Sequence, residues 1–289
     1  ADGQNAAANL VAKGYYVSKA NTANLSLLSG ISLGLALSYV NEETETGAIF
    51  FGESTKGALS VQALANVNSE ASATPSSGVF EVASAKTNIA QAVQKSKIEA
   101  AVKAVDNDQP HITDTTLDVK ASSTVSVNAK VIPGNIAGSV GGSVVGMTLN
   151  TATAKLEATQ SAHVSDAVLR GNTSANIVSE MNNANNKTGA TASVAGNAGS
   201  VSLISNSPNV ATATSDAKVY AFMSGTDAEI TGALTVATKG NSYAKSDVQF
   251  GTNVSAGHVG INVVYANAKG EYQAYVNATK DISVGKLAV

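Results

Sequence analysis

The chain has 289 residues, of which 44% are hydrophobic but only 4% are aromatic and 13% are charged, and its net charge is −3. This ample apolar content and low charge exclude a disordered polyelectrolyte. The chain contains a single arginine, Arg170, and no basic run, which argues against nucleic-acid binding. No uninterrupted apolar run of about eighteen residues is present, so we expect no membrane-spanning helix. The absence of cysteine excludes disulfides, thiolate metal sites and cysteine nucleophiles, and it suits an exported protein.

Apolar residues recur at every second position in several segments along the chain, among them 31–39, 125–129 and 261–265. The residues between them are mostly Ser, Thr and Asn, seldom Lys or Glu. A period of two is typical of half-buried strands. Because Gly, Asn and Ser turns separate these segments throughout the chain, the sequence predicts an all-β solenoid.

A short strand-like seed, in which Leu or Ile and Val stand two residues apart after a turn, recurs along the chain. It occurs in segments 57–61, 116–121, 232–237 and 281–284. We expect equivalent seed residues to stack and to point into the interior. The side chains predicted to point inward are Leu59, Val61, Leu117, Val119, Leu234 and Val236.

Two further signatures accompany the seed. An Ala-x-Ala-Lys stretch occurs at 83–86, 152–155 and 266–269, with a weaker copy at 215–218. Gly- and Ser-rich segments at 29–35, 138–146 and 255–261 form the other set. The spacing of all these copies drifts between roughly fifty and seventy residues, which indicates a degenerate long repeat.

Segment 89–105 contains good helix formers, and taken alone it would be an amphipathic helix. The repeat favours a strand for 89–93, because residues 86–93 are expected to occupy the place of the later segment 269–276, which is rich in Tyr and Val. For 98–105 helix and strand both remain open. A turn at 106–110 ends either structure.

These alternating strands, seeds, Gly/Ser segments and Ala-x-Ala-Lys stretches together resemble the β-helical repeats of giant exported bacterial surface proteins. That group includes filamentous-haemagglutinin-like proteins, autotransporter passengers and giant β-helical leukotoxins. The resemblance extends from about Leu10 to Val289 and implies a right-handed parallel β-helix. With coils of about twenty residues, the chain would make a rod of about fourteen coils and about 65–70 Å. We expect residues 1–289 to be a single solenoid that is a fragment of a longer protein.

No group of residues matches a known catalytic or metal-binding signature. The three histidines stand far apart in unrelated contexts, the acidic residues suit solvated turns, and Gly138–Gly142 lacks the Gly-Lys-Ser/Thr ending of a phosphate-binding loop. We therefore predict no catalytic residue, no metal site and no cofactor. The best chance of a cluster lies in the turn region 106–114. The candidates weighed are His111, His163, His258, Glu42, Glu43, Glu45, Asp106, Asp108 and Asp114.

The resemblance implies a secreted or cell-surface protein of a bacterium. We expect a non-enzymatic shaft segment of an adhesin or leukotoxin-like toxin that binds host cells or extracellular matrix and is monomeric as a fragment. Two alternatives are a polysaccharide-cleaving β-helix enzyme, which would need clustered carboxylates and an aromatic sugar platform, and the head of a trimeric autotransporter adhesin, which would need a shorter and stricter repeat.

Overall fold

The computed structural model describes residues 7–23, 29–55, 57–74, 80–105, 108–132, 141–182, 189–195, 200–249 and 253–289. Within them the regular structure consists entirely of β-strands. Their bounds are β1 Ala7–Ala23, β2 Ser29–Phe50, β3 Glu53–Thr55, β4 Ala58–Thr74, β5 Phe80–Lys103, β6 His111–Thr113, β7 Thr116–Val131, β8 Gly141–Ser165, β9 Val168–Met181, β10 Ala190–Ala195, β11 Ser200–Asn206, β12 Asn209–Ser224, β13 Asp227–Gly240, β14 Ala244–Gln249, β15 Asn253–Val259, β16 Asn262–Asn277 and β17 Ile282–Ala288.

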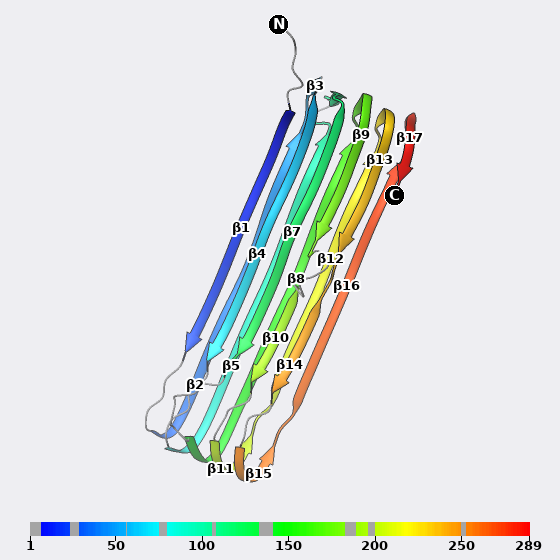
Figure 1. Cartoon of the computed structure of the whole chain (residues 1–289). Coiled ribbons are helices and arrows are strands. Elements are labelled where there is room, and N and C mark those ends of the chain that lie inside the picture. Colours follow the sequence, from blue (N-terminus) through cyan, green and yellow to red (C-terminus); the bar gives the residue numbers. More distant parts are fainter. Residues whose placement is uncertain are drawn as a thin grey trace.

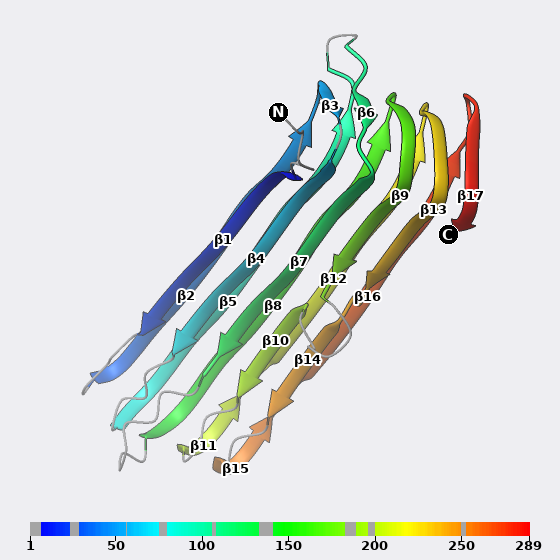
Figure 2. The same cartoon turned by 45° about the horizontal axis from the view of Figure 1, so that its top comes forward.

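The strands alternate between two parallel sheets that face each other (Figures 1 and 2). Sheet A has ten strands, with β1, β4, β7, β9, β13 and β17 in spatial order, and sheet B has seven, with β2, β5, β8, β12 and β16 in spatial order. Each coil therefore contributes one long stretch to sheet A and one to sheet B before the chain steps to the next coil. This arrangement is that of a parallel β-helix, so the predicted fold class is confirmed.

The expected coil of about twenty residues is wrong. Neighbouring coils are offset by 51 residues where Ala7 pairs with Ala58 and by 62 where Asn88 pairs with Asn150. The strands form five coils, and β17 begins a sixth. The long repeat in the sequence is thus the coil itself, and the number of about fourteen coils came from the resemblance rather than from that repeat.

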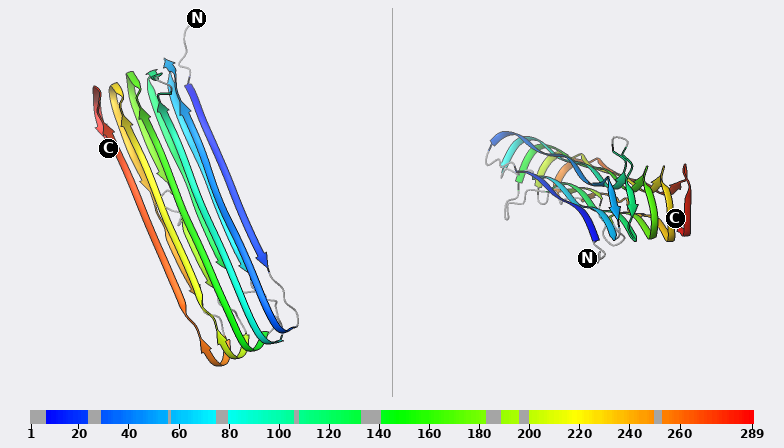
Figure 3. Two further views of the ribbon diagram at one scale, coloured as in Figure 1. Left: turned by 180° about the vertical axis from the view of Figure 1, so that it is seen from behind. Right: turned by 90° about the horizontal axis from the view of Figure 1, so that it is seen from above.

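The expectation that the molecule is longest along the stack of coils is also wrong. Five coils stacked about 4.8 Å apart extend only about 25 Å, whereas a strand of 24 residues such as β5 extends about 80 Å. The molecule is elongated along its strands, as Figure 1 and the rear view in Figure 3 show. The view from above in Figure 3 shows the coils side by side, from β1 to β17.

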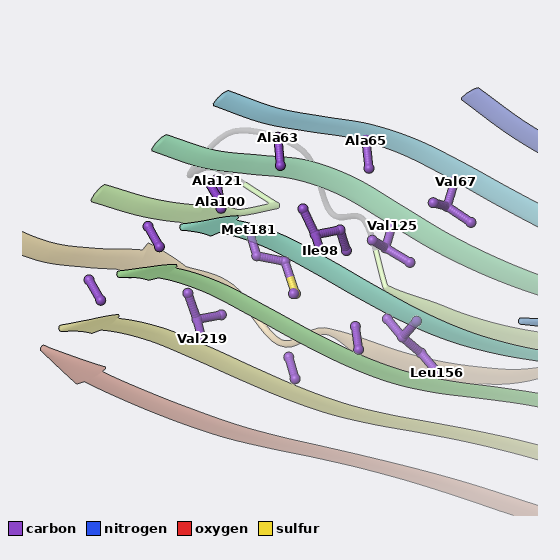
Figure 4. Close-up of a cluster of buried hydrophobic side chains, with 14 of the residues drawn as sticks. Ala63, Ala65, Val67, Ile98, Ala100, Ala121, Val125, Leu156, Met181 and Val219 are labelled. Carbon is purple, nitrogen blue, oxygen red and sulfur yellow. The ribbon is translucent and has the colours of Figure 1, made fainter. Parts of the chain in front are cut away.

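Side chains between the two sheets form columns of matched residues (Figure 4). Leu59, Leu117 and Leu234 occupy one column with Ala175 between the last two, and all are at most 1% exposed. The adjacent column consists of the predicted Val61, Val119 and Val236 together with Ile177, again nearly unexposed. Both predicted seed columns are therefore confirmed for the first three seeds.

The fourth seed is not equivalent to the others. Ile282 pairs with Ala228, while Leu287 pairs with Leu234. The residue that continues the leucine column is therefore Leu287, five positions after the residue that the sequence pattern suggested.

An asparagine ladder runs through the interior of sheet B. The side-chain amide of Asn88 donates to Asn150 Oδ1, that of Asn150 to Asn209 Oδ1, and that of Asn209 to Asn262 Oδ1, each at 2.8 Å. Asn88, Asn150 and Asn209 are buried. Because in-register strands lie about 4.8 Å apart, each amide reaches the next coil's carbonyl oxygen, so the polar groups of this buried column bond to each other.

A second set of interior polar groups joins the two sheets. Gln160 Oε1 on β8 accepts from Ser123 of β7 at 2.5 Å, while Gln160 Nε2 donates to Ser179 Oγ of β9 at 3.1 Å. One coil earlier, Ser69 of β4 donates to Gln94 Oε1 of β5 at 2.5 Å. These bonds cross the core, and they hold the sheets together where the interior is polar rather than aliphatic.

Segment 89–103 is a strand, since β5 continues to Lys103 and pairs with β2 and β8 on its two sides. The strand prediction for 89–93 is confirmed, and the open alternative beyond 98 is resolved as strand up to Lys103. The alignment behind it is wrong, however. Lys269 lies in the register of Asp216, Glu157 and Lys95, not of Lys86, so the Ala-x-Ala-Lys stretches do not mark equivalent positions.

We expect Val236→Asp to lower the free energy of unfolding by about 3 kcal/mol or more, because it buries an unpaired carboxylate in a closed column. Thr235→Asp, one residue away on the outer face, is the matched control and should cost far less. Thermal unfolding followed by circular dichroism measures both. Equal melting temperatures for the two variants would contradict the observed inward register.

We expect Asn150→Ala to cost about 2–5 kcal/mol, because it leaves the Asn88 amide and the Asn209 carbonyl oxygen buried without partners. Thr151→Ala, on the outer face of the same strand, should change stability by less than about 1 kcal/mol. Denaturant unfolding compares the two. If Asn150→Ala lowered the free energy of unfolding no more than Thr151→Ala, the hydrogen bonds of the ladder would not contribute to stability.

Candidate functional surface

The outer face of sheet B carries charged residues in rows that run across the coils. One row consists of Glu43, Lys95, Glu157, Asp216 and Lys269, each paired in register with the next. The neighbouring row contains Glu45 beside Lys97, whose ammonium lies 2.8 Å from the Glu45 carboxylate. Opposite charges on adjacent strands attract, so the pairs Glu43–Lys95, Lys95–Glu157 and Asp216–Lys269 favour the observed register, whereas the like-charged pair Glu157–Asp216 opposes it.

A shallow depression of about 760 Å³ lies over these rows. Its charged lining consists of three lysines and four acids: Lys95, Lys97, Lys218, Glu43, Glu45, Glu157 and Asp216. Thr159 adds a hydroxyl group. Both signs of charge are present along one open surface, which suits a partner with both hydrogen-bond donors and acceptors.

An apolar area lies further toward the start of the same strands. Ile31, Leu33 and Met147 there expose 75%, 85% and 55% of their surfaces. A depression of about 430 Å³ is lined by Leu33, Leu35, Met147, Leu149 and Pro208, among others. Exposed apolar patches of this kind mark interaction surfaces on soluble proteins.

His163 lies at the far end of β8, on the outer side of sheet B, and is nevertheless only 7% exposed. Its ring stacks on Phe222 at 4.6 Å between centroids, and Phe222 stacks on Tyr275 at 5.1 Å. The three residues share a register on β8, β12 and β16. Because the coils stack in register, these three rings, one from each coil, form a continuous ladder.

The pKa of His163 is lowered to about 4, chiefly because the ring is buried; the Glu99 carboxylate opposes this shift and the Lys103 charge adds to it. His163 is therefore neutral at pH 7, and its 3.7 Å contact with Glu99 is not an ion pair there. Partial burial raises the pKa of Glu99, but the hydrogen bond and charge of Lys103, with the charges of His163 and Lys97, outweigh this and lower it. His163 Nδ1 is buried and has no hydrogen-bond partner.

The structure keeps the other histidines apart from His163. His111 is exposed on β6, and its backbone amide donates to Gly52 O at 3.0 Å. His258 is exposed on β15 of the last coil, where Nδ1 lies 2.6 Å from Ser205 Oγ. Among the described residues no three His, Asp or Glu side chains are grouped so that they could hold a metal ion.

Asp114 has a structural place in the turn between β6 and β7. It is 1% exposed, and its Oδ1 accepts the backbone amide of Gly57 from the previous coil at 2.8 Å. Asn172, from the next coil, donates to the backbone oxygen of Asp114 at 2.7 Å. Through its carboxylate and its backbone oxygen, Asp114 therefore links three coils, whereas Asp108 is exposed and Asp106 lies outside the described residues.

The remaining candidates also belong to the framework. Glu42 points inward and accepts from Ser69 at 2.9 Å, while Glu43 and Glu45 line the charged depression. Of the glycine-rich segment 138–142, only Gly141 and Gly142 lie within the described residues, where they begin β8. None of the described residues belongs to a helix long and apolar enough to cross a membrane.

Two features were not foreseen, the charged rows and the aromatic ladder. Each needs the correct offset between coils, because Phe222 and His163 stand 59 positions apart and look unrelated until the strands are aligned. The asparagines at 88, 150, 209 and 262 could have revealed this offset in the sequence, since they recur at the coil length.

Comparisons with protein-family models, with curated proteins and with solved structures found no match.

We expect acidification to destabilise the fold through His163. Its pKa is about 6.5 when unfolded and about 4 when folded, so the unfolded chain binds the proton first and stability falls as the pH drops from about 6.5 to about 4, by about 3 kcal/mol in total. His163→Phe keeps the ring stack and should remove this loss. The variant should be more stable than the parent at pH 4.5 and not at pH 8. His111→Gln, at an exposed site, is the control, and equal pH profiles for parent and His163→Phe would contradict the assignment.

Proposed function

We propose that this chain is a non-enzymatic β-helical shaft segment of a large secreted or cell-surface bacterial protein, of the adhesin or leukotoxin-like class, and that it binds host cells or extracellular matrix. The observation that carries the proposal is the outer face of sheet B. There an exposed apolar area and a depression with both signs of charge lie along one surface of a stacked scaffold. An interior filled by columns of small side chains supports the assignment to a scaffold. The export and virulence roles rest on the sequence resemblance.

The proposed contact is made by side chains on rigid strands rather than on loops. Lys95 and Lys97 on β5 and Lys218 on β12 stand on strands that are hydrogen-bonded on both sides. The backbone of such a surface is fixed before binding, so little backbone conformational entropy is lost when a partner docks.

Binding to cultured host cells or to immobilised matrix proteins tests the proposal. Replacing Lys95, Lys97 and Lys218 together by Glu should weaken binding by at least about tenfold, because each reversed charge contributes a fraction of a kcal/mol or more. The matched control reverses three lysines on the outer face of sheet A, Lys19, Lys120 and Lys239. Equal losses in the two triple variants, or no binding by the parent chain, would count against the proposed surface.

A polysaccharide-cleaving enzyme is the second candidate. Polysaccharide, peptide and ester substrates test it directly, with Asp108→Ala and His111→Ala as the diagnostic variants. Turnover that either substitution abolishes, with the fold intact, would refute the structural proposal.

A further inference from the structure

The outer face of sheet B carries uncharged side chains near the start of its strands, at the bottom of Figure 1. The outward positions of five neighbouring segments are in register there, and we call them the apolar rows. None of these positions holds a charged residue, and the first charge beyond them is Lys155. The apolar rows comprise every second residue of segments 31–39, 83–91, 145–153, 204–212 and 257–265.

The apolar rows are exposed in the middle coils as well as in the outer ones. On β8, Val145 is 44% and Met147 is 55% exposed, and on β11 Ile204 is 59% exposed, although both strands are paired on their two sides. A further coil would add a strand beside β2 or β16, and it would lengthen these rows rather than cover them. Their exposure therefore belongs to the face of the sheet and not to its edges.

The apolar rows have the size of a stable protein interface. Five strands about 4.8 Å apart, with nine residues of about 3.3 Å each, cover about 24 Å by about 30 Å, or about 700 Å². A standard interface buries about 800 Å² on each partner, whereas the largest apolar patch of a typical monomer covers about 300–600 Å². The apolar rows thus exceed what a monomeric protein ordinarily exposes and come close to what a stable dimer needs.

We propose that the apolar rows bind the same rows of a second copy of the chain, so that two copies of sheet B pack face to face in a symmetric dimer. A second copy offers an uncharged face of equal area, and such a contact uses the same surface on both partners. Sheets that pack face to face interlock their side chains across about 10 Å. The depression of about 430 Å³ around Ala85 and Met147 leaves room for side chains of the partner. This dimer goes beyond the proposed function, and it differs from the monomer expected from the sequence.

The charged rows decide how the two copies are oriented. On β5, Lys95 lies eight residues, or about 26 Å, beyond Thr87 at the centre of the apolar rows. Parallel strands would bring the acids and lysines of both copies together within the contact, where burial of charge is costly. Antiparallel strands place the charged depression of each copy outside the contact, at opposite ends of the dimer. We therefore assign antiparallel strands to the dimer, which keeps both charged depressions open to a partner.

Sedimentation of the full chain tests the contact. The parent should form a discrete dimer, and Leu33→Glu should weaken dimerisation by at least about tenfold because it places a charge between two apolar faces. Leu33 is 85% exposed, so the substitution leaves the fold of the single copy intact. Asn66→Glu, at an exposed position on the outer face of sheet A, is the matched control and should dimerise as the parent does.

A parent chain that stays monomeric up to about 1 mM would overturn the proposal, and so would equal dimerisation of the parent and Leu33→Glu. Binding of a monomeric parent to phosphatidylcholine vesicles, lost in Leu33→Glu, would also overturn it, because the apolar rows would then be a lipid-binding face.

The methionines provide a probe within the parent sequence. Met147 lies in the apolar rows and is 55% exposed, whereas Met181 and Met223 are buried. The rate at which hydrogen peroxide oxidises Met147 should fall several-fold as the protein concentration rises and the dimer forms. In Leu33→Glu this rate should stay at the value of the monomer. A dimer in which Met147 is as reactive as in the monomer would use another face and contradict the proposal.

A spin label tests the orientation, since the parent chain has no cysteine. Lys155→Cys places a nitroxide on β8 six residues, or about 20 Å, beyond Leu149. Two labels in the antiparallel dimer should lie about 40 Å apart, whereas parallel strands would bring them close to the sheet separation of about 10 Å. Pulsed electron paramagnetic resonance measures this distance, and a value near the shorter one would overturn the proposed arrangement.

Discussion

Parallel strands that stack in register place each side chain about 4.8 Å from its counterpart in the next coil, so every position of a coil has to suit its own copies. Apolar positions satisfy this requirement by repeating, as in the columns of Leu59 and Val61. Several charged positions satisfy it by pairing opposite signs, as where Glu43 meets Lys95 and Lys95 meets Glu157, although Glu157 then meets Asp216, a like charge. Register is thus the constraint from which the core and the outer rows both follow.

The same constraint makes a polar interior possible. An isolated buried asparagine would leave several donors and acceptors without partners, at a cost of about 1–3 kcal/mol for each group. In the column from Asn88 to Asn262 each amide finds the next one at 2.8 Å, because all copies share one position. The ladder also discriminates between registers, since a shift of one residue would turn the asparagines to the outer face.

The sequence predicted the parallel β-helix, the strand at 89–93 and the inward residues of three seeds, because these depend on a period of two and on the turn that precedes each seed. It did not predict the coil length, although the repeated segments recur at a spacing of roughly fifty to seventy residues. The value of about twenty residues came from the resemblance, and it conflicted with the 51–63 residues that separate paired positions. Site features such as the stack of His163 on Phe222 depend on that offset, so they could not be found without it.

The offset between coils changes mainly in the connections between strands, and also at the register shifts within β13 between Glu229 and Ala233. Phe50 pairs with Val102 at an offset of 52 residues, whereas Glu53 pairs with His111 at an offset of 58, so the extra residues of the second coil lie between β5 and β6. The strands on either side keep their columns, because a shift within a strand would move every side chain to the wrong face. The interior columns leave little room for a ligand, since most members of the hydrophobic core are Ala and Val packed together. Recognition by this scaffold therefore has to use its outer rows or its connections, and the outer face of sheet B offers such rows on strands that are hydrogen-bonded on both sides.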